Sequence, residues 1–162
     1  NGDHFYEVNL NQGSAPDNTQ RFIRWAAQWY INNGYENYGF KMLGRGLHYP
    51  QDMSMPYHTA AAENLTAWEH FQYESWHKNN YEKHDFGYWQ GLGAKYSSET
   101  ISSDGDLADK TKELANKSYD QLSDVYGGNW GDDVFATQYN MYLLGKYAGP
   151  MAEYAAPGYF DF

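Results

Sequence analysis

The 162-residue sequence predicts an all-α fold in a single domain. Two observations support this prediction. Apolar residues recur at helical spacing in successive stretches, and glycine, proline and asparagine separate these stretches from one another. The length suits one domain of ordinary size with its own hydrophobic core and is too short for two domains of ordinary size.

The first predicted helix covers residues 17–33 and follows an irregular entry segment of sixteen residues. Its apolar side chains recur at the spacing i, i+3, i+4 and i+7 of one helix face: Phe22, Trp25, Ala26 and Trp29. Gly34 follows directly and suits a left-handed cap, because glycine carries no penalty at positive φ. We therefore expect this helix to end at Asn33.

A second helix is predicted over residues 36–52, with Phe40, Leu43 and Leu47 among its apolar positions. Pro50 is expected to end or kink it, because proline lacks the amide proton and clashes with the carbonyl of Gly46.

Three further helices complete the predicted fold. One covers residues 58–80 and carries Trp68, which we interpret as a core residue. The next begins at Asp106, whose negative charge suits a helix N-terminus, and continues to Val125. The last begins near Asp132 and ends at Gly149 and Pro150.

Residues 84–106 are predicted to form a long loop, because glycine, serine, aspartate and tyrosine are frequent there. Loops of this length are usually functional or mobile. Phe86, Tyr88 and Trp89 are accordingly candidates for a lid or a membrane contact, and a packed aromatic loop is the alternative.

The composition excludes several classes of function. With 11 Lys+Arg against 21 Asp+Glu the formal net charge is −10, which argues against duplex nucleic acid or an anionic bilayer as a charge-driven partner. The absence of cysteine excludes disulfides, thiolate metal sites and a cysteine nucleophile. Aromatic residues make up 19% of the chain, a density that suits a wet-edged core or a surface that meets amphipathic ligands.

Two pairs of metal-ligating residue types share one spacing. His48 and Asp52 are four residues apart, so a helix directs both side chains to one face, and His70 and Glu74 repeat the pattern on the next predicted helix. A single pair of this kind occurs on many solvated helix faces. Two pairs on antiparallel helices can converge on one point, which favours a metal site.

Further histidines accompany these pairs. His58 stands between them in the sequence, and His4 lies in the entry segment. Imidazole and carboxylate ligands together suit zinc. His77 follows His70 by seven residues. It is a candidate either for a residue that orients the metal ligands by hydrogen bonding or for a buried, hydrogen-bonded histidine. His84 falls in the predicted loop and is interpreted as solvated.

At these residues the sequence resembles the bacterial zinc-dependent phospholipase C family, which includes the catalytic domain of the clostridial alpha-toxin type. The strong part of the resemblance consists of LGRGLHYPQD at 43–52, PYH at 56–58 and HFQYE at 70–74. A weaker match at HFY, residues 4–6, extends it across nearly the whole chain. Because the second pair ends in Glu74, the match favours this family over the related zinc nucleases of the fungal and plant type, which usually have aspartate there.

The resemblance implies an all-helical fold that holds three zinc ions in a cleft. The ligand sets that it implies are His4, His48 and Asp52 for one ion, and His58, His70 and Glu74 for another. It also implies that Asp52 bridges to the third ion, and Asp52 and Glu74 are the candidate catalytic carboxylates. Family enzymes cleave the glycerol–phosphate ester of phosphatidylcholine and similar lipids. The resemblance therefore implies a secreted, toxin-like hydrolase that acts on phospholipid at a membrane surface and releases diacylglycerol.

The sequence departs from the family in two respects. Family enzymes are longer, and nothing in residues 1–3 replaces the ligands of their N-terminal part. We therefore expect the family's N-terminal helices to be lacking here and a second polypeptide, separate or produced by nicking, to complete the site as a heterodimer. In addition, Pro50 and Gln51 stand where the family usually has an apolar residue and glycine, so the geometry of the His48–Asp52 pair depends on how the helix accommodates Pro50.

Two other functions stay open. The chain is alternatively a non-catalytic, zinc-stabilised lipid-binding or toxin component that retains one or two structural zinc ions. The second alternative is a zinc nuclease, since a net charge of −10 does not prevent metal ions from binding phosphate directly.

Overall fold

The computed structural model of the chain describes residues 4–60, 67–126, 130–132 and 134–162, and the elements in these ranges confirm the predicted all-α class. The elements are α1 (Ala15–Asn33), α2 (Glu36–Met53), the 3-10 helix η2 (Pro56–Thr59), α3 (Ala67–Asn79), α4 (Phe86–Lys95), α5 (Asp104–Tyr119), α6 (Leu122–Val125) and α7 (Val134–Ala155).

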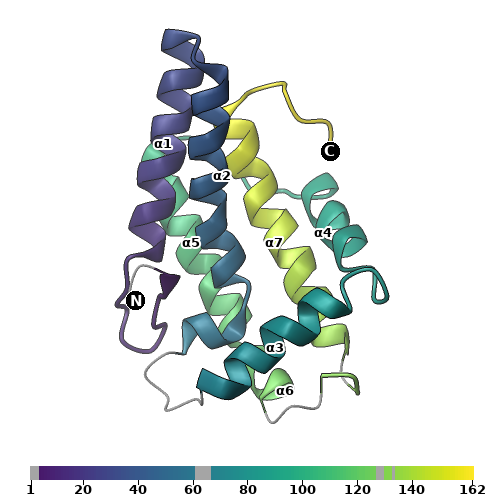
Figure 1. Cartoon of the computed structure of the whole chain (residues 1–162). Coiled ribbons are helices and arrows are strands. Elements are labelled where there is room, and N and C mark those ends of the chain that lie inside the picture. The colour runs from purple at the N-terminus through teal and green to yellow at the C-terminus, as the bar shows by residue number, and fades with distance from the viewer. Residues whose placement is uncertain (1–3, 61–66, 127–129, 133) are drawn as a thin grey trace.

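The longer helices form a bundle. α1 and α2 make an antiparallel hairpin, α5 and α7 pack beside it, and α4 lies against α7 (Figure 1). The main core fills the space between these helices and includes Ile23 and Leu114. A smaller core, which includes Tyr57 and Tyr73, joins η2, α3 and α6 at the end of the bundle opposite the α1–α2 turn (Figure 1).

The first two helices agree with the prediction to within two residues. Gly34 caps α1 in the left-handed conformation, with φ of 67°. The buried face of α1 is lined by Ile23 and Ala26, whereas Trp25 and Trp29 are only partly buried at the edge of the core. The predicted aromatic stripe therefore borders the core instead of filling it.

Pro50 lies inside α2, three residues before the helix ends at Met53. Its own carbonyl accepts a backbone hydrogen bond from Ser54 (2.9 Å), so the helical pattern continues past the proline. Placed this near the C-terminus, the proline does not separate His48 from Asp52.

The prediction that the last helix ends at Gly149 and Pro150 is wrong, because α7 continues to Ala155. A proline at position 150 leaves the carbonyl of Lys146 without its usual backbone donor. The hydroxyl group of Ser97 donates to this carbonyl at 2.6 Å. A side chain from a distant loop thus replaces the hydrogen bond that the proline removes, and the helix continues.

The predicted helix over 58–80 is also corrected. His58 lies in η2, and α3 begins at Ala67; residues 61–66 lie outside the described part of the chain. The carbonyls of His58 and Thr59 accept backbone hydrogen bonds from Tyr6 (3.2 Å) and Val8 (3.1 Å). Because these carbonyls bind the entry segment, they do not continue a helix, and the entry segment is fixed beside η2.

The helix predicted from Asp106 begins two residues earlier, at Asp104, because Ser103 is its N-cap. The carboxylate of Asp106 accepts a hydrogen bond from the backbone amide of Ser103 (3.2 Å), as in a capping box. α5 ends at Tyr119, and the buried residue Val125 belongs to the separate short helix α6.

The loop predicted over residues 84–106 contains helix α4, and that prediction is wrong for residues 86–95. A Cβ atom at Gly93 would lie 1.9 Å from the backbone oxygen of Tyr142, and one at Gly145 would lie 1.8 Å from that of Gln90. The glycines that indicated a loop instead let the α4 and α7 backbones touch. Tertiary packing here overrides the low helix propensity of glycine.

Among the lid candidates of this segment, Phe86 is fully buried and Trp89 packs partly against the core, while Tyr88 is exposed. Within the described residues, no helix has both the length and the apolar character needed to cross a bilayer.

Candidate metal centre

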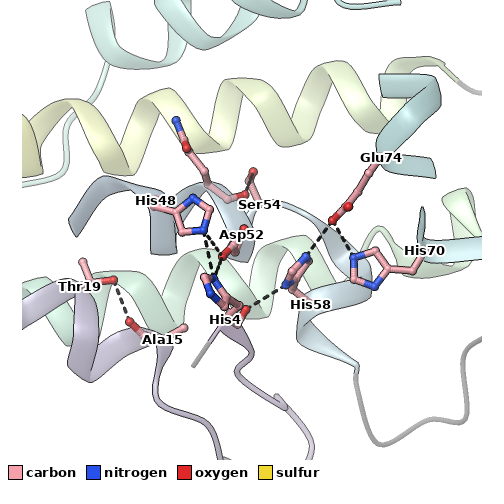
Figure 2. A network of polar contacts seen from close by, with 10 residues as sticks. His4, Ala15, Thr19, His48, Asp52, Ser54, His58, His70 and Glu74 are labelled. Atoms are coloured by element: carbon pink, nitrogen blue, oxygen red, sulfur yellow. Dashed lines mark hydrogen bonds and ion pairs between the residues drawn. The ribbon is translucent and has the colours of Figure 1, made fainter. Parts of the chain in front are cut away.

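The structure brings the six candidate ligands together in two clusters, which lie next to each other (Figure 2). Group 1 consists of His4 from the entry segment and His48 and Asp52 from α2. Group 2 consists of His58 from η2 and His70 and Glu74 from α3. Within each group, one ligand atom per residue lies within 4.8 Å of the others.

Group 1 is a tight triangle of ligand atoms. His4 Nδ1 lies 2.8 Å and His48 Nε2 lies 3.2 Å from Oδ2 of Asp52, and the two nitrogens are 3.1 Å apart. The i, i+4 pair therefore converges despite Pro50, which answers the question that the sequence departure raised.

No single placement of protons satisfies all three contacts of group 1. If both imidazole nitrogens donate to Asp52, neither offers a lone pair to the other, and their 3.1 Å contact is not a hydrogen bond. If His48 donates to His4, a nitrogen lone pair of His4 faces the carboxylate. A cation at the centre would instead attract all three lone pairs at once, so the arrangement fits a metal ion.

Group 2 centres on one carboxylate oxygen. Oε1 of Glu74 lies 3.0 Å from Nε2 of His58 and 2.8 Å from Nε2 of His70. The other ring nitrogen of His58, Nδ1, lies 2.9 Å from the carbonyl oxygen of His4. A carbonyl only accepts, so Nδ1 carries a proton and Nε2 is the ring nitrogen that faces Glu74.

This use of both ring nitrogens of His58 is typical of metal-bound histidine, in which the nitrogen opposite the metal donates to a carbonyl. Two imidazole nitrogens and one carboxylate oxygen are a donor set that zinc accepts. Bond lengths of 2.0–2.1 Å place tetrahedral zinc ligands roughly 3.3 Å apart, and the contacts of both groups are close to that spacing. The residues present therefore fit zinc.

The contacts of group 2 favour the ionised form of Glu74 and the protonated form of His58. Hydrogen bonds from His58 and His70 hold the pKa of Glu74 well below its usual range. Burial alone would lower the pKa of His58, but the hydrogen bond to Glu74 and the charge of Asp52 outweigh burial and raise that pKa. Glu74 is thus ionised and available as an anionic ligand.

Aromatic rings hold the imidazoles of group 2 in place. Phe5 stacks on His58 with ring centroids 4.8 Å apart, and Tyr57 stacks on His70 at 5.6 Å. The hydroxyl of the buried Tyr57 donates to Oε2 of Glu69 (3.0 Å). We did not select Phe5, Tyr57 or Glu69 from the sequence, although each of them directly precedes or follows a ligand.

The two groups differ in exposure. In group 1 the side chains of His4 and His48 are 38% and 48% exposed, whereas in group 2 those of His58 and His70 are 10% and 20% exposed. Group 1 is therefore the more open cluster. Cavities of about 410 and 590 Å³ beside α4 and α7 include none of the six ligand candidates in their linings.

His77 and His84 belong to neither group. The ring of His77 stacks on Phe86 at 4.8 Å, and among the described residues its buried Nε2 has no hydrogen-bond partner. His77 as a whole is half-buried and Nε2 has no hydrogen bond, so the prediction of a buried, hydrogen-bonded histidine is only partly met. His84 stacks on Trp76 and is half-buried, so the prediction that it is solvated is only partly met.

No family model and no curated protein matches this chain. Among solved structures, the chain is similar to the alpha toxin from Clostridium absonum, with a TM-score of 0.66 and 17% sequence identity over 99% of this chain. This chain has the fold of the matched half of that alpha toxin. The match covers 50% of the toxin chain, so the 162 residues correspond to about half of its length. The alpha-toxin type of fold expected from residues 43–74 is confirmed, and the ligand roles of the six residues stay predictions.

Proposed function

We propose that this chain takes part in zinc-dependent hydrolysis of phospholipid phosphodiesters, as a phospholipase C that releases diacylglycerol. The observation that carries the proposal is the pair of adjacent three-ligand groups on an alpha-toxin fold. Each group joins two imidazoles to one carboxylate, and the backbone of His4 connects the two groups through His58.

Asp52 and Glu74 have the same task in this proposal. One oxygen of each carboxylate lies within 3.2 Å of two imidazole nitrogens, so one carboxylate and two imidazoles face a shared point in each group. When bound, zinc ions would neutralise the phosphate oxygens and lower the pKa of bound water toward 7. In the overall reaction, a water oxygen forms a bond to phosphorus, the bond from phosphorus to the glycerol oxygen breaks, and diacylglycerol leaves with a proton.

We also propose that a second polypeptide completes the centre, in a secreted heterodimer or a nicked protein. The described residues supply two groups of ligands and no third group for the third ion that the resemblance implies. A zinc ion with three protein ligands keeps one position for water or substrate. The mass of the native species and its zinc content test this proposal, and three zinc ions with full activity in the isolated chain would contradict it.

Phosphatidylcholine in mixed micelles, with added zinc and the native partner chain present, provides the direct test of hydrolysis. We expect release of diacylglycerol and phosphocholine, abolition of this release in His58→Ala, and retention in the matched control His84→Ala. Both histidines contact aromatic rings, but only His58 belongs to a ligand group.

The same experiment distinguishes the two alternatives. A chain that binds vesicles equally well with His58→Ala and hydrolyses no lipid, alone or with its native partner, would be a non-catalytic lipid-binding component. A chain that cleaves single-stranded nucleic acid in preference to phosphatidylcholine would be a zinc nuclease.

A further inference from the structure

Two aromatic side chains on α3 lie exposed beside group 2. Trp68 is 67% exposed and Phe71 is 60% exposed, and their rings stack with centroids 6.1 Å apart at an interplanar angle of 24°. The prediction that Trp68 belongs to the core is therefore wrong. Large aromatic rings that gather on a surface indicate a surface that meets another molecule.

The opposite face of α3 already supplies the packing of this helix. Tyr73 is buried, and Trp76 packs partly against both cores. α3 is thus apolar on two faces, one of which packs against the bundle and one of which does not. Figure 1 shows α3 lying across the end of the bundle, where none of the longer helices in the described part of the chain covers its outer side.

The charged residues nearest the two rings along α3 include the acidic Glu69 and Glu74, of which the Glu74 side chain is 43% exposed. Glu69 lies between Trp68 and Phe71 in the sequence, but its carboxylate accepts a hydrogen bond from the buried Tyr57 hydroxyl at 3.0 Å. The exposed neighbour on the next position, Gln72, is neutral. The whole chain has a formal net charge of −10, so an anionic bilayer would repel it.

Position along the helix connects the two rings with group 2. His70 lies between Trp68 and Phe71 in the sequence, and Glu74 follows Phe71 by three residues, about 4.5 Å along the axis at 1.5 Å per residue. A surface held against these rings would therefore lie within one helical turn of two group 2 ligands.

We propose that Trp68 and Phe71 anchor the chain to a zwitterionic lipid surface. The amphipathic ring of Trp68 favours the boundary between headgroups and acyl chains, and the apolar ring of Phe71 suits its acyl side. Rings buried about 5–10 Å into that boundary would bring group 2 to the level of the lipid phosphates. The identification of the lipid phosphate as the target rests on the proposed function, whereas the anchoring itself is tested without hydrolysis.

The test measures how the full chain partitions onto phosphatidylcholine vesicles in a sedimentation assay. We expect the double variant Trp68→Ala/Phe71→Ala to lose roughly tenfold or more of the partition constant, because interfacial burial of two rings is removed. The matched control Tyr88→Ala/Tyr96→Ala removes two rings of similar exposure, 63% and 65%, from α4 and its C-cap, and should bind as the wild type does.

Two further measurements keep the result interpretable. Far-UV circular dichroism and zinc content establish that each variant is folded, and the conservative variant Trp68→Tyr/Phe71→Tyr, which retains both rings, should recover most of the binding. Vesicles that contain anionic lipid should bind the wild type more weakly than phosphatidylcholine vesicles do.

The outcomes separate this inference from the proposed function. Wild-type chain that does not bind the vesicles, equal binding by the folded double variant, or loss of binding in the Tyr88/Tyr96 control alone would overturn the anchoring role. A double variant that changes oligomeric state would overturn it in favour of a protein contact. If the wild type binds through these rings but hydrolyses no phosphodiester with zinc and its native partner present, the anchoring role stands and the proposed function fails.

Discussion

Replacing glycine by alanine is expected to have opposite effects on stability at two positions of α4, Gly93 and Gly91. A Cβ atom at Gly93 would lie 1.9 Å from the backbone oxygen of Tyr142, whereas one at Gly91, two residues earlier in α4, would have no neighbour within 4 Å. An ordinary contact begins near 3.4 Å. The variant Gly93→Ala must therefore move α4 about 1.5 Å away from α7, since backbone atoms cannot rotate aside as a side chain can.

The free energies follow from these distances. Overpacking of a tight contact costs about 1–3 kcal/mol, and alanine recovers about 1 kcal/mol of helix propensity relative to glycine. We expect Gly93→Ala to lower the free energy of unfolding by up to about 2 kcal/mol and Gly91→Ala to raise it by up to about 1 kcal/mol. For a chain of this length, the largest expected difference between the variants, about 3 kcal/mol, corresponds to roughly 10 °C in Tm.

Urea unfolding followed by far-UV circular dichroism measures both variants, with the m-value as a check that the transition stays two-state. Equal stability of Gly93→Ala and Gly91→Ala would refute the close contact between α4 and α7. A loss of stability in Gly91→Ala would refute the helical conformation of α4 itself.

The remaining predictions concern the metal groups and one ion pair. Zinc at 100 times its Kd should stabilise the folded chain by about 2.7 kcal/mol per site, seen as a rise in Tm that a chelator reverses; an unchanged Tm would argue against both sites. Glu74→Gln should weaken zinc binding roughly tenfold or more in a chelator-competition assay, while Gln72→Ala on the same helix should not, and equal zinc affinity of the two variants would refute the ligand role of Glu74. The hydrogen bond from Lys110 lowers the pKa of Glu99, so this pair stabilises the fold above the unfolded pKa of Glu99 and the effect fades as pH falls through the lower folded pKa. The advantage of the wild type over Glu99→Gln in unfolding free energy should therefore shrink on acidification, and an advantage that is independent of pH would contradict the ion pair.

Local patterns predicted those parts of the fold that local interactions determine. The ends of α1 and α2 follow from Gly34 and from apolar spacing, and the i, i+4 pairs of both metal groups follow from helix geometry. The convergence of the pairs depends on tertiary packing, and it was the spacing of the histidines together with the family resemblance that indicated it. His4, 44 residues before His48, illustrates how far such a contact lies beyond any periodicity.

The wrong predictions for α4 and for the end of α7 share one physical cause. In each case a long-range contact stabilises a helix where the local sequence disfavours one. Pro150 would be expected to end the helix, but the hydroxyl of Ser97 donates to the carbonyl of Lys146 and the helix continues. Gly93 alone favours a loop, but in the folded chain it allows the backbone of α7 to pack directly against α4. Neither partner can be identified from a window of neighbouring residues, so no pattern in the sequence could have revealed α4 or the last turns of α7.

The double use of His4 has a consequence for how metal ions would load. Its side chain belongs to group 1, and its carbonyl oxygen receives the Nδ1–H of His58 in group 2. An ion at either group would therefore restrict the backbone that the other group needs, and the second ion would meet a segment whose conformational entropy has already been lost. The two binding events would be positively cooperative and, by thermodynamic linkage, each would strengthen the other by the same factor.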